Sequence, residues 1–147
     1  MAVRSYPLRL AFLLLAVLGL SLGLPGGTPA FAQSPPDQLL FGPKQYLRTS
    51  GAPNSYTDSF TVPASVGAPF LLHIVNGNAD GTGRVSSATV TINNVQVAGP
   101  NDFNQNVAVV DRTVTRQPTT TLQVTLASGP AGFLTIHVFG TKILPTP

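Results

Sequence analysis

The sequence predicts an all-β protein, an antiparallel β-sandwich of the jelly-roll or immunoglobulin-like kind with seven or eight strands. Apolar and polar residues alternate over many short segments, which is the pattern of half-buried strands. Turn-forming residues separate these segments at intervals of about 8–12 residues. The chain also contains no glutamate, one of the strong helix formers. Together these observations favour strands and turns over helices.

The first 32 residues have the features of a secretory signal peptide. Arg4 and Arg9 precede an apolar stretch at residues 10–24, and Ala30 and Ala32 form an A-x-A cleavage site. The apolar stretch is shorter than the roughly 20 residues that a membrane-spanning helix needs. We therefore expect export, cleavage after Ala32, and no membrane span after cleavage. The expected location is secreted or periplasmic, in association with the cell envelope.

The rest of the chain is expected to form one domain with two extensions. Residues 33–42 contain Pro35-Pro36 and predict an extended tether. Residues 43–141 are expected to form the sandwich, and residues 142–147 a C-terminal tail. The absence of cysteine excludes disulfides, thiolate nucleophiles, Cys-ligated zinc and a bacterial lipid anchor.

The first expected strands follow the tether. Residues 44–49 predict a short strand, which a turn at residues 51–54 ends. Residues 56–62 alternate before a proline, with Tyr56, Asp58, Phe60 and Val62 on one side and three hydroxyl residues on the other. Residues 69–75 (PFLLHIV) form a near-continuous apolar run, which is typical of a strand covered on both faces.

The middle of the chain predicts a long loop and a hairpin. Residues 76–83 are rich in Gly and Asn, which accept positive φ angles. Residues 87–93 show the clearest alternation in the chain. Asn93-Asn94 then predicts a tight turn, after which the strand pattern resumes at residues 95–97.

The last third of the chain predicts four more strands. Residues 103–110 predict a strand that exposes alternate valines to one face. Residues 112–116 predict a short edge strand. Residues 121–126 and 134–138 alternate regularly between apolar and polar side chains on either side of a Gly/Pro turn. They are expected to form the last two strands of the domain.

The net charge excludes two classes of partner. Two of the eight cations, Arg4 and Arg9, belong to the signal peptide, and the remaining six nearly balance the five aspartates. A nearly neutral domain has no electrostatic footprint for nucleic acid or an anionic membrane. We therefore expect neither as a partner.

The loop after residue 75 has the spacing of a weak calcium site. Asn76, Asn78 and Asp80 carry oxygens at alternate positions and Gly81 follows, as in the first half of an EF-hand loop. Asp80 is its one carboxylate, so calcium would bind weakly. The alternative is a hairpin loop whose Asn and Asp side chains bond to their own backbone.

The sequence offers no pattern for catalysis. His73 and His137 lie on expected strands, and each could join a serine nucleophile or begin a metal site. The chain has no G-x-S-x-G elbow, and no further ligand stands at metal-binding spacing. Both histidines are therefore expected to be partly buried, hydrogen-bonded side chains. We expect no enzyme activity and no cofactor.

Three aromatic residues are candidates for ligand binding. Tyr46, Tyr56 and Phe139 could act as stacking platforms for a sugar, beside the amides and hydroxyls of polar strand faces. The alternative is that phenylalanines fill the core and tyrosines cap its edge.

One structural ion pair is expected. Arg84 and Asp102 stand at the entrances of two expected strands, in a chain with only 9% charged residues. We expect them to pair at one end of the sandwich, where an exposed pair contributes about 0.2–1 kcal/mol.

Several motifs resemble a β-sandwich module of exported bacterial surface proteins, which often occurs beside immunoglobulin-like or fibronectin-type repeats. The resemblance covers about residues 42–140. Its most specific parts are the RVSSA stretch at residues 84–88, Asn93 with Val97, and GPNDF at residues 99–103. The closing strands and their Gly129-Pro130 turn also fit. The resemblance implies a surface location and a structural or adhesive role, and it transfers no functional residues.

We therefore expect a non-catalytic secreted module with a structural, adhesive or assembly role at the bacterial cell envelope or matrix. Its partners would be other envelope or matrix proteins, or a second copy of the chain. Edge strands could recruit another chain through backbone pairing, with residues 39–41 as the candidate added strand. The alternative is a carbohydrate-binding module that acts on extracellular polysaccharide.

Overall fold

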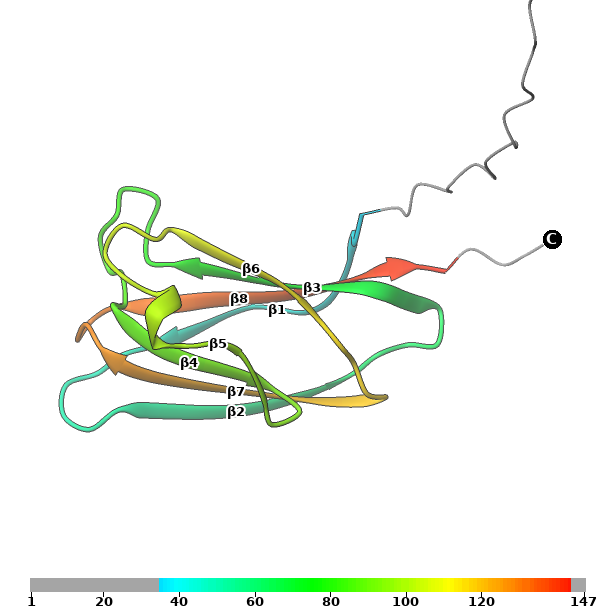
Figure 1. Cartoon of the computed structure of the whole chain (residues 1–147), viewed down its shortest axis with the longest axis horizontal. Helices are drawn as coiled ribbons and strands as arrows, with labels where there is room; N and C mark the ends of the chain where they lie inside the picture. The colour runs from blue at the N-terminus through cyan, green and yellow to red at the C-terminus, as the bar shows by residue number, and fades with distance from the viewer. Residues whose placement is uncertain (1–34, 144–147) are drawn as a thin grey trace, which may run out of the picture. The chain divides into compact units, whose positions relative to one another are not determined.

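Two four-stranded antiparallel sheets face each other in the computed structural model, which describes residues 35–143 (Figure 1). A three-residue 3-10 helix, η1 (Pro100–Asp102), follows the fifth strand. The strands are β1 (Gln38–Leu47), β2 (Asn54–Thr61), β3 (Val66–Asn76), β4 (Ser87–Ile92), β5 (Val95–Ala98), β6 (Val109–Val114), β7 (Thr119–Ser128) and β8 (Phe133–Lys142). The predicted antiparallel β-sandwich is confirmed.

The strand order is that of a jelly roll. One sheet has the order β1-β8-β3-β6 and the other β2-β7-β4-β5. The first strand therefore pairs with the eighth, the second with the seventh, the third with the sixth and the fourth with the fifth. An immunoglobulin-like sandwich would instead place its first strand beside its second. Of the two predicted kinds of sandwich, the pairing is that of the jelly roll.

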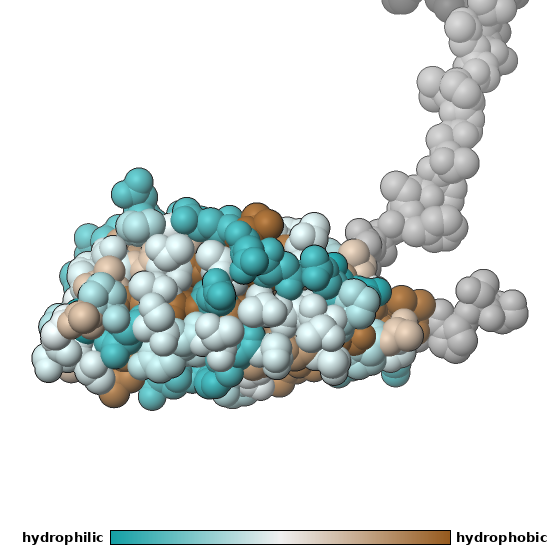
Figure 2. Space-filling model, turned by 90° about the horizontal axis from the view of Figure 1, so that it is seen from below, coloured by the Kyte–Doolittle hydropathy of each residue, from teal (hydrophilic) through white to brown (hydrophobic). Residues whose placement is uncertain are grey.

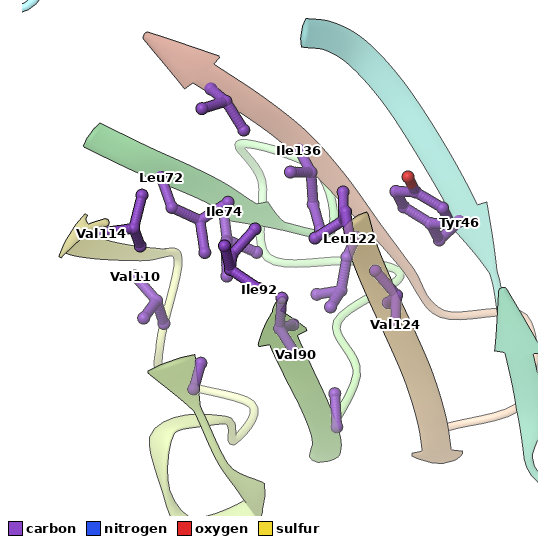
Figure 3. Packing of buried hydrophobic residues seen from close by; sticks show 14 of the residues in the cluster. Tyr46, Leu72, Ile74, Val90, Ile92, Val110, Val114, Leu122, Val124 and Ile136 are labelled. Carbon is purple, nitrogen blue, oxygen red and sulfur yellow. The ribbon is translucent and has the colours of Figure 1, made fainter. Parts of the chain in front are cut away.

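The core lies between the sheets and follows from the alternation in the sequence. Every second residue of a strand points inward, so β7 and β8 each bury one apolar row. Figure 3 shows side chains from the two sheets meeting in this layer, with Leu72 and Ile136 from one sheet and Val90 and Leu122 from the other. These four side chains are fully buried. Burying each one contributes about 1.5–3 kcal/mol.

The predicted tether is wrong for residues 38–42. These residues form the first half of β1 and pair with β8, with Leu39 opposite Phe139. Leu40 and Phe41 pack against the core, so burial of their apolar side chains holds the segment in the sheet. The candidate added strand at residues 39–41 is thus an edge strand of its own domain.

A bulge interrupts the pairing of β1 with β8 around Gly42-Pro43. Gly42 has φ +87°, and a Cβ there would collide with the backbone carbonyl of Ile136. Pro43 has no N–H to donate, which an edge strand tolerates. Glycine is therefore required at this position of β1, where its backbone lies against the backbone of β8.

The two strands predicted at residues 103–110 and 112–116 are a single strand, β6, which begins only at Val109. The residues before it form a loop, because the Asn104 carbonyl accepts the Val107 N–H and its side-chain Oδ1 accepts the Asn106 N–H. Phe103 lies outside the strands, but its side chain packs in the core, with 2% of its surface exposed. The asparagines therefore override the apparent alternation.

The predicted tight turn at Asn93-Asn94 is confirmed. Both residues have positive φ, 50° and 64°, as a type I′ hairpin requires. The Asn93 side chain also accepts the Thr121 N–H at 2.9 Å, which ties the β4–β5 hairpin to β7.

Some sequence predictions concern residues that the structure does not describe. The expected signal peptide, residues 1–32, lies outside the described residues. The expected tail begins at Lys142, which is instead the last residue of β8, and residues 144–147 also lie outside. Within residues 35–143, no helix is long and apolar enough to cross a membrane.

Candidate functional site

Asn76, the first expected calcium ligand, is a buried structural clamp. Only 1% of its surface is exposed, at the end of β3. Its Oδ1 accepts the Val85 N–H at 2.7 Å, and its Nδ2 donates to the carbonyls of Val85 and Val107 at 3.0 and 3.1 Å. The Asn76 oxygen is therefore engaged by a backbone N–H, and the calcium prediction is wrong about this ligand.

Asn78 and Asp80 bond within their own loop. Asp80 accepts hydrogen bonds from the Thr82 hydroxyl at 2.7 Å and the Thr82 N–H at 2.9 Å, and these bonds lower the pKa of Asp80. Asn78 Nδ2 donates to the Thr82 hydroxyl at 2.9 Å. These contacts match the self-bonded hairpin loop that was the alternative to a calcium site. Within residues 35–143, no three His, Cys, Asp or Glu side chains could hold one metal ion together.

The expected Arg84–Asp102 ion pair is wrong, because each side chain has another partner. Asp102 pairs with Arg112 of β6 at 2.7 Å and also accepts the Gly99 N–H. Arg84 donates to the Gln105 carbonyl at 2.7 Å, and the Gln105 amide donates back to the Arg84 carbonyl. The Asp102–Arg112 pair links the segment after β5 to β6, and so joins the two sheets.

Tyr46 and Tyr56, two of the expected stacking platforms, pack into the sandwich. Tyr46 is 1% exposed and donates its hydroxyl to Asp58 at 2.7 Å. Tyr56 is half-buried, meets Tyr46 edge to face at 5.3 Å, and donates its hydroxyl to the Leu47 carbonyl. The tyrosines therefore cap the edge of the core, and the stacking prediction is wrong for Tyr46.

Lys44, Tyr46 and Asp58 form a polar network between β1 and β2. Lys44 Nζ lies 2.5 Å from one Asp58 oxygen, and the Tyr46 hydroxyl lies 2.7 Å from the other. Burial and the bond to Asp58 raise the pKa of Tyr46. Burial opposes ionisation of Asp58, but hydrogen bonds from Lys44 and Tyr46 lower its pKa overall. The network joins the two sheets at one edge.

The outer face of the β1-β8-β3-β6 sheet is rich in apolar side chains, and we call it the apolar face. Its apolar members are Leu39 and Leu47 of β1, Leu71 and Val75 of β3, Val109 of β6, and Phe133 and Phe139 of β8. Within residues 35–143, five large hydrophobic side chains are exposed, and three of them belong to this face. Leu39, Val109 and Leu47 are 42%, 44% and 47% exposed.

A row of three polar side chains, two histidines and one aspartate, crosses the centre of the apolar face. His137, His73 and Asp111 are directly opposite one another on β8, β3 and β6. His73 Nδ1 lies 2.6 Å from Asp111 Oδ1, and the two histidine ring centroids are 5.6 Å apart. His137 also stacks on Phe139, with centroids 5.9 Å apart and ring planes at 8°. Phe139, the third expected platform, thus lies on this face, away from Tyr46 and Tyr56.

The outer face of the β2-β7-β4-β5 sheet carries hydroxyls, and we call it the hydroxyl face. Cross-strand contacts bind its side chains to one another, such as Ser55 to Thr125 at 3.1 Å and Thr91 to Gln123 at 3.3 Å. Figure 2 views the molecule from the side on which β2 and β7 lie in Figure 1, and the surface there is mainly pale or teal. The outward residues of its three longest strands are Ser55, Thr57, Ser59, Thr61, Ser87, Thr89, Thr91, Thr119, Thr121, Gln123, Thr125 and Ala127.

The histidine row is the feature that sequence reasoning missed. The sequence predicts each histidine separately as a partly buried, hydrogen-bonded side chain and indicates no role for Asp111. Their meeting depends on the register of three strands that are far apart in the chain, which no local pattern encodes. The available signal was that each histidine stands between two inward apolar residues, so both had to point outward.

No protein-family model, no curated protein and no solved structure matches the chain.

Proposed function

We propose that the protein is a non-catalytic assembly module, exported to the bacterial cell envelope or matrix, whose copies dock through the apolar face. Export rests on the signal-peptide pattern of residues 1–32. The structural or adhesive role rests on the two faces of the sandwich, which differ sharply in chemistry.

The exposure of the apolar face carries the proposal. Residues 69–75 have the near-continuous apolar sequence of a strand covered on both faces. The opposite sheet covers the inward side of this strand, while Leu71, His73 and Val75 on its outward side are only partly buried. Exposed apolar side chains that gather on one face of a soluble protein are a common mark of an interaction site.

A second copy of the chain suits this face as the occupant. Residues 35–143 contain six cationic side chains and five aspartates, so their net charge is close to zero and two copies repel each other little. Apolar side chains lie on all four strands of the face, including the edge strands β1 and β6, and they flank the central row of His137, His73 and Asp111. Two identical faces can meet about a two-fold axis.

Sedimentation of the full chain tests the proposal. The variant Leu71→Thr with Val75→Thr replaces two central apolar side chains by residues that also favour strands. The control Ser59→Thr with Gln123→Thr changes the hydroxyl face to a similar extent. We expect the wild type and the control to self-associate as concentration rises, and the apolar-face variant to stay monomeric. A wild type that is monomeric at every concentration would contradict the proposal.

Polysaccharide binding remains the alternative function. The position of the Phe139 ring on the apolar face favours it. The Phe139 side chain is only partly buried and stacks nearly in parallel on His137. A glycan array would separate the two functions. Retention of the wild type that is lost in Phe139→Ala would favour the polysaccharide function, and no retention on any glycan would exclude it.

A further inference from the structure

We propose that His73 and His137 together bind one transition-metal ion of the class of Zn²⁺, Ni²⁺ and Cu²⁺ on the apolar face. One nitrogen of each imidazole would coordinate the ion, and Asp111 would orient the His73 ring. The inference does not rest on assembly, because it needs only the side chains of one chain.

The strand register brings the two imidazoles together. His73 and His137 are direct partners on the antiparallel strands β3 and β8, and both point outward. Direct partners on one sheet face have Cβ atoms about 4.5–5.5 Å apart. The ring centroids lie 5.6 Å apart. Two imidazoles that share a tetrahedral Zn²⁺ with Zn–N bonds of about 2.1 Å have centroids about 5 Å apart. The observed centroid separation is therefore close to the one that a shared ion requires.

Asp111 supplies the outer contact that such a site requires. Histidines that bind metals almost always donate their second ring N–H to a carboxylate, a carbonyl or water. Asp111 Oδ1 lies 2.6 Å from His73 Nδ1. A proton held at Nδ1 by this carboxylate leaves the Nε2 lone pair of the neutral ring as the metal ligand.

The unpartnered Nδ1 atom of His137 also supports a metal site. This atom is shielded from solvent and has no hydrogen-bond partner among the described residues. Buried polar atoms without a partner are uncommon, and a bound ion is one of the roles that account for them. Stacking on Phe139 fixes the plane of this ring without using either nitrogen.

The donor set selects the class of metal. Imidazole suits zinc, copper and nickel, whereas magnesium and calcium take oxygen ligands. Among residues 35–143, no third His, Cys, Asp or Glu joins the two rings as a ligand. Water would fill the remaining positions, which leaves the site open and its affinity moderate. Copper is expected to bind more tightly than nickel or zinc.

Calorimetric titration of the full chain, produced without a polyhistidine tag, tests the inference. The protein is kept dilute enough to sediment as a single chain, and Zn²⁺, Ni²⁺, Mg²⁺ and Ca²⁺ are titrated in turn. We expect one Zn²⁺ or Ni²⁺ per chain and no binding of Mg²⁺ or Ca²⁺. His73→Gln and His137→Gln should each weaken Zn²⁺ binding at least tenfold.

Two further variants separate orientation from charge. Asp111→Asn should weaken Zn²⁺ binding about 10–100-fold while one ion still binds per chain. Asp37→Asn is the matched control, because it removes an equal charge from an exposed residue outside the row, and it should bind as the wild type does.

The wild type alone also provides a test that does not depend on folded variants. The chain contains two histidines, so its nuclear magnetic resonance spectrum contains two imidazole spin systems. Added Zn²⁺ should shift both. The inference is overturned if neither imidazole responds, if no Zn²⁺ binds, or if both glutamine variants bind Zn²⁺ as tightly as the wild type.

Discussion

The apolar face and the hydroxyl face are built on the same scaffold but differ in what they present to solvent. Both sheets have four antiparallel strands, and both bury an aliphatic row inward, such as Ile136 in β8 and Leu122 in β7. Outward, β7 presents Thr, Gln and Ala, whereas β3 presents Leu, His and Val.

This difference shows which residues the fold itself requires. The hydroxyl face forms regular strands from Ser and Thr, so outward apolar side chains are not needed for strand formation. The outward Leu, Val and Phe side chains of the apolar face are therefore not required for strand formation. The proposed docking of a second copy would account for their exposure.

Truncations inside the sandwich should have the largest effect, and an equal effect in the two sheets. Ile136→Ala and Leu122→Ala each remove a fully buried side chain. We expect each to lower the free energy of unfolding by about 2–5 kcal/mol, measured by urea denaturation. A loss below about 1 kcal/mol in one sheet alone would mean that the inward rows are not equivalent.

Removing the Asn76 clamp, which holds the loops before β4 and β6 to the end of β3, should have the next largest effect. Asn76→Ala leaves the Val85 N–H and the Val107 carbonyl without their side-chain partner. Such unsatisfied buried groups cost about 1–3 kcal/mol each, so thermal unfolding should shift markedly downward. Asn78→Ala, which breaks an exposed contact in the same loop, serves as the control and should shift it little.

The network between β1 and β2 should give a smaller, pH-dependent effect. Asp58→Asn removes the ion pair with Lys44 and should cost about 1 kcal/mol at neutral pH. Because the folded-state pKa of Asp58 is lowered, its stabilising contribution is complete above the unfolded value of about 4 and is lost as pH falls through the folded pKa. The stability difference between wild type and variant should therefore shrink below pH 4. A constant difference from pH 7 to pH 2 would contradict this account.

Converting the hydroxyl face should have the smallest effect on stability. Thr89→Val with Thr91→Val places two apolar side chains at outward positions of β4. We expect the free energy of unfolding to change by less than about 1 kcal/mol, because valine also favours strands. Light scattering should nevertheless detect new association through the altered face. Unchanged scattering would show that outward valines alone do not create a docking surface.

The inward pattern of this protein could be read from the sequence, and the contacts between distant strands could not. Residues 121–126 and 134–138 were predicted as strands because a period of two residues is local information, and the Asn93-Asn94 turn is local too. Asp102 was assigned to the wrong arginine because Arg112 reaches it only once β6 lies beside β5. The histidine row was missed for the same reason, since its register depends on three strands.

The most direct test compares the accessibility of the two faces within the assembled protein. The chain has no native cysteine, so a single thiol can be placed on either face. Thr135→Cys lies on β8 in the apolar face, and Thr125→Cys lies at a matched outward position of β7 in the hydroxyl face. Maleimide labelling of Thr135→Cys should slow as protein concentration rises, while labelling of Thr125→Cys should not change. A labelling rate of Thr135→Cys that stays constant as protein concentration rises would contradict the assignment of the apolar face as the docking surface.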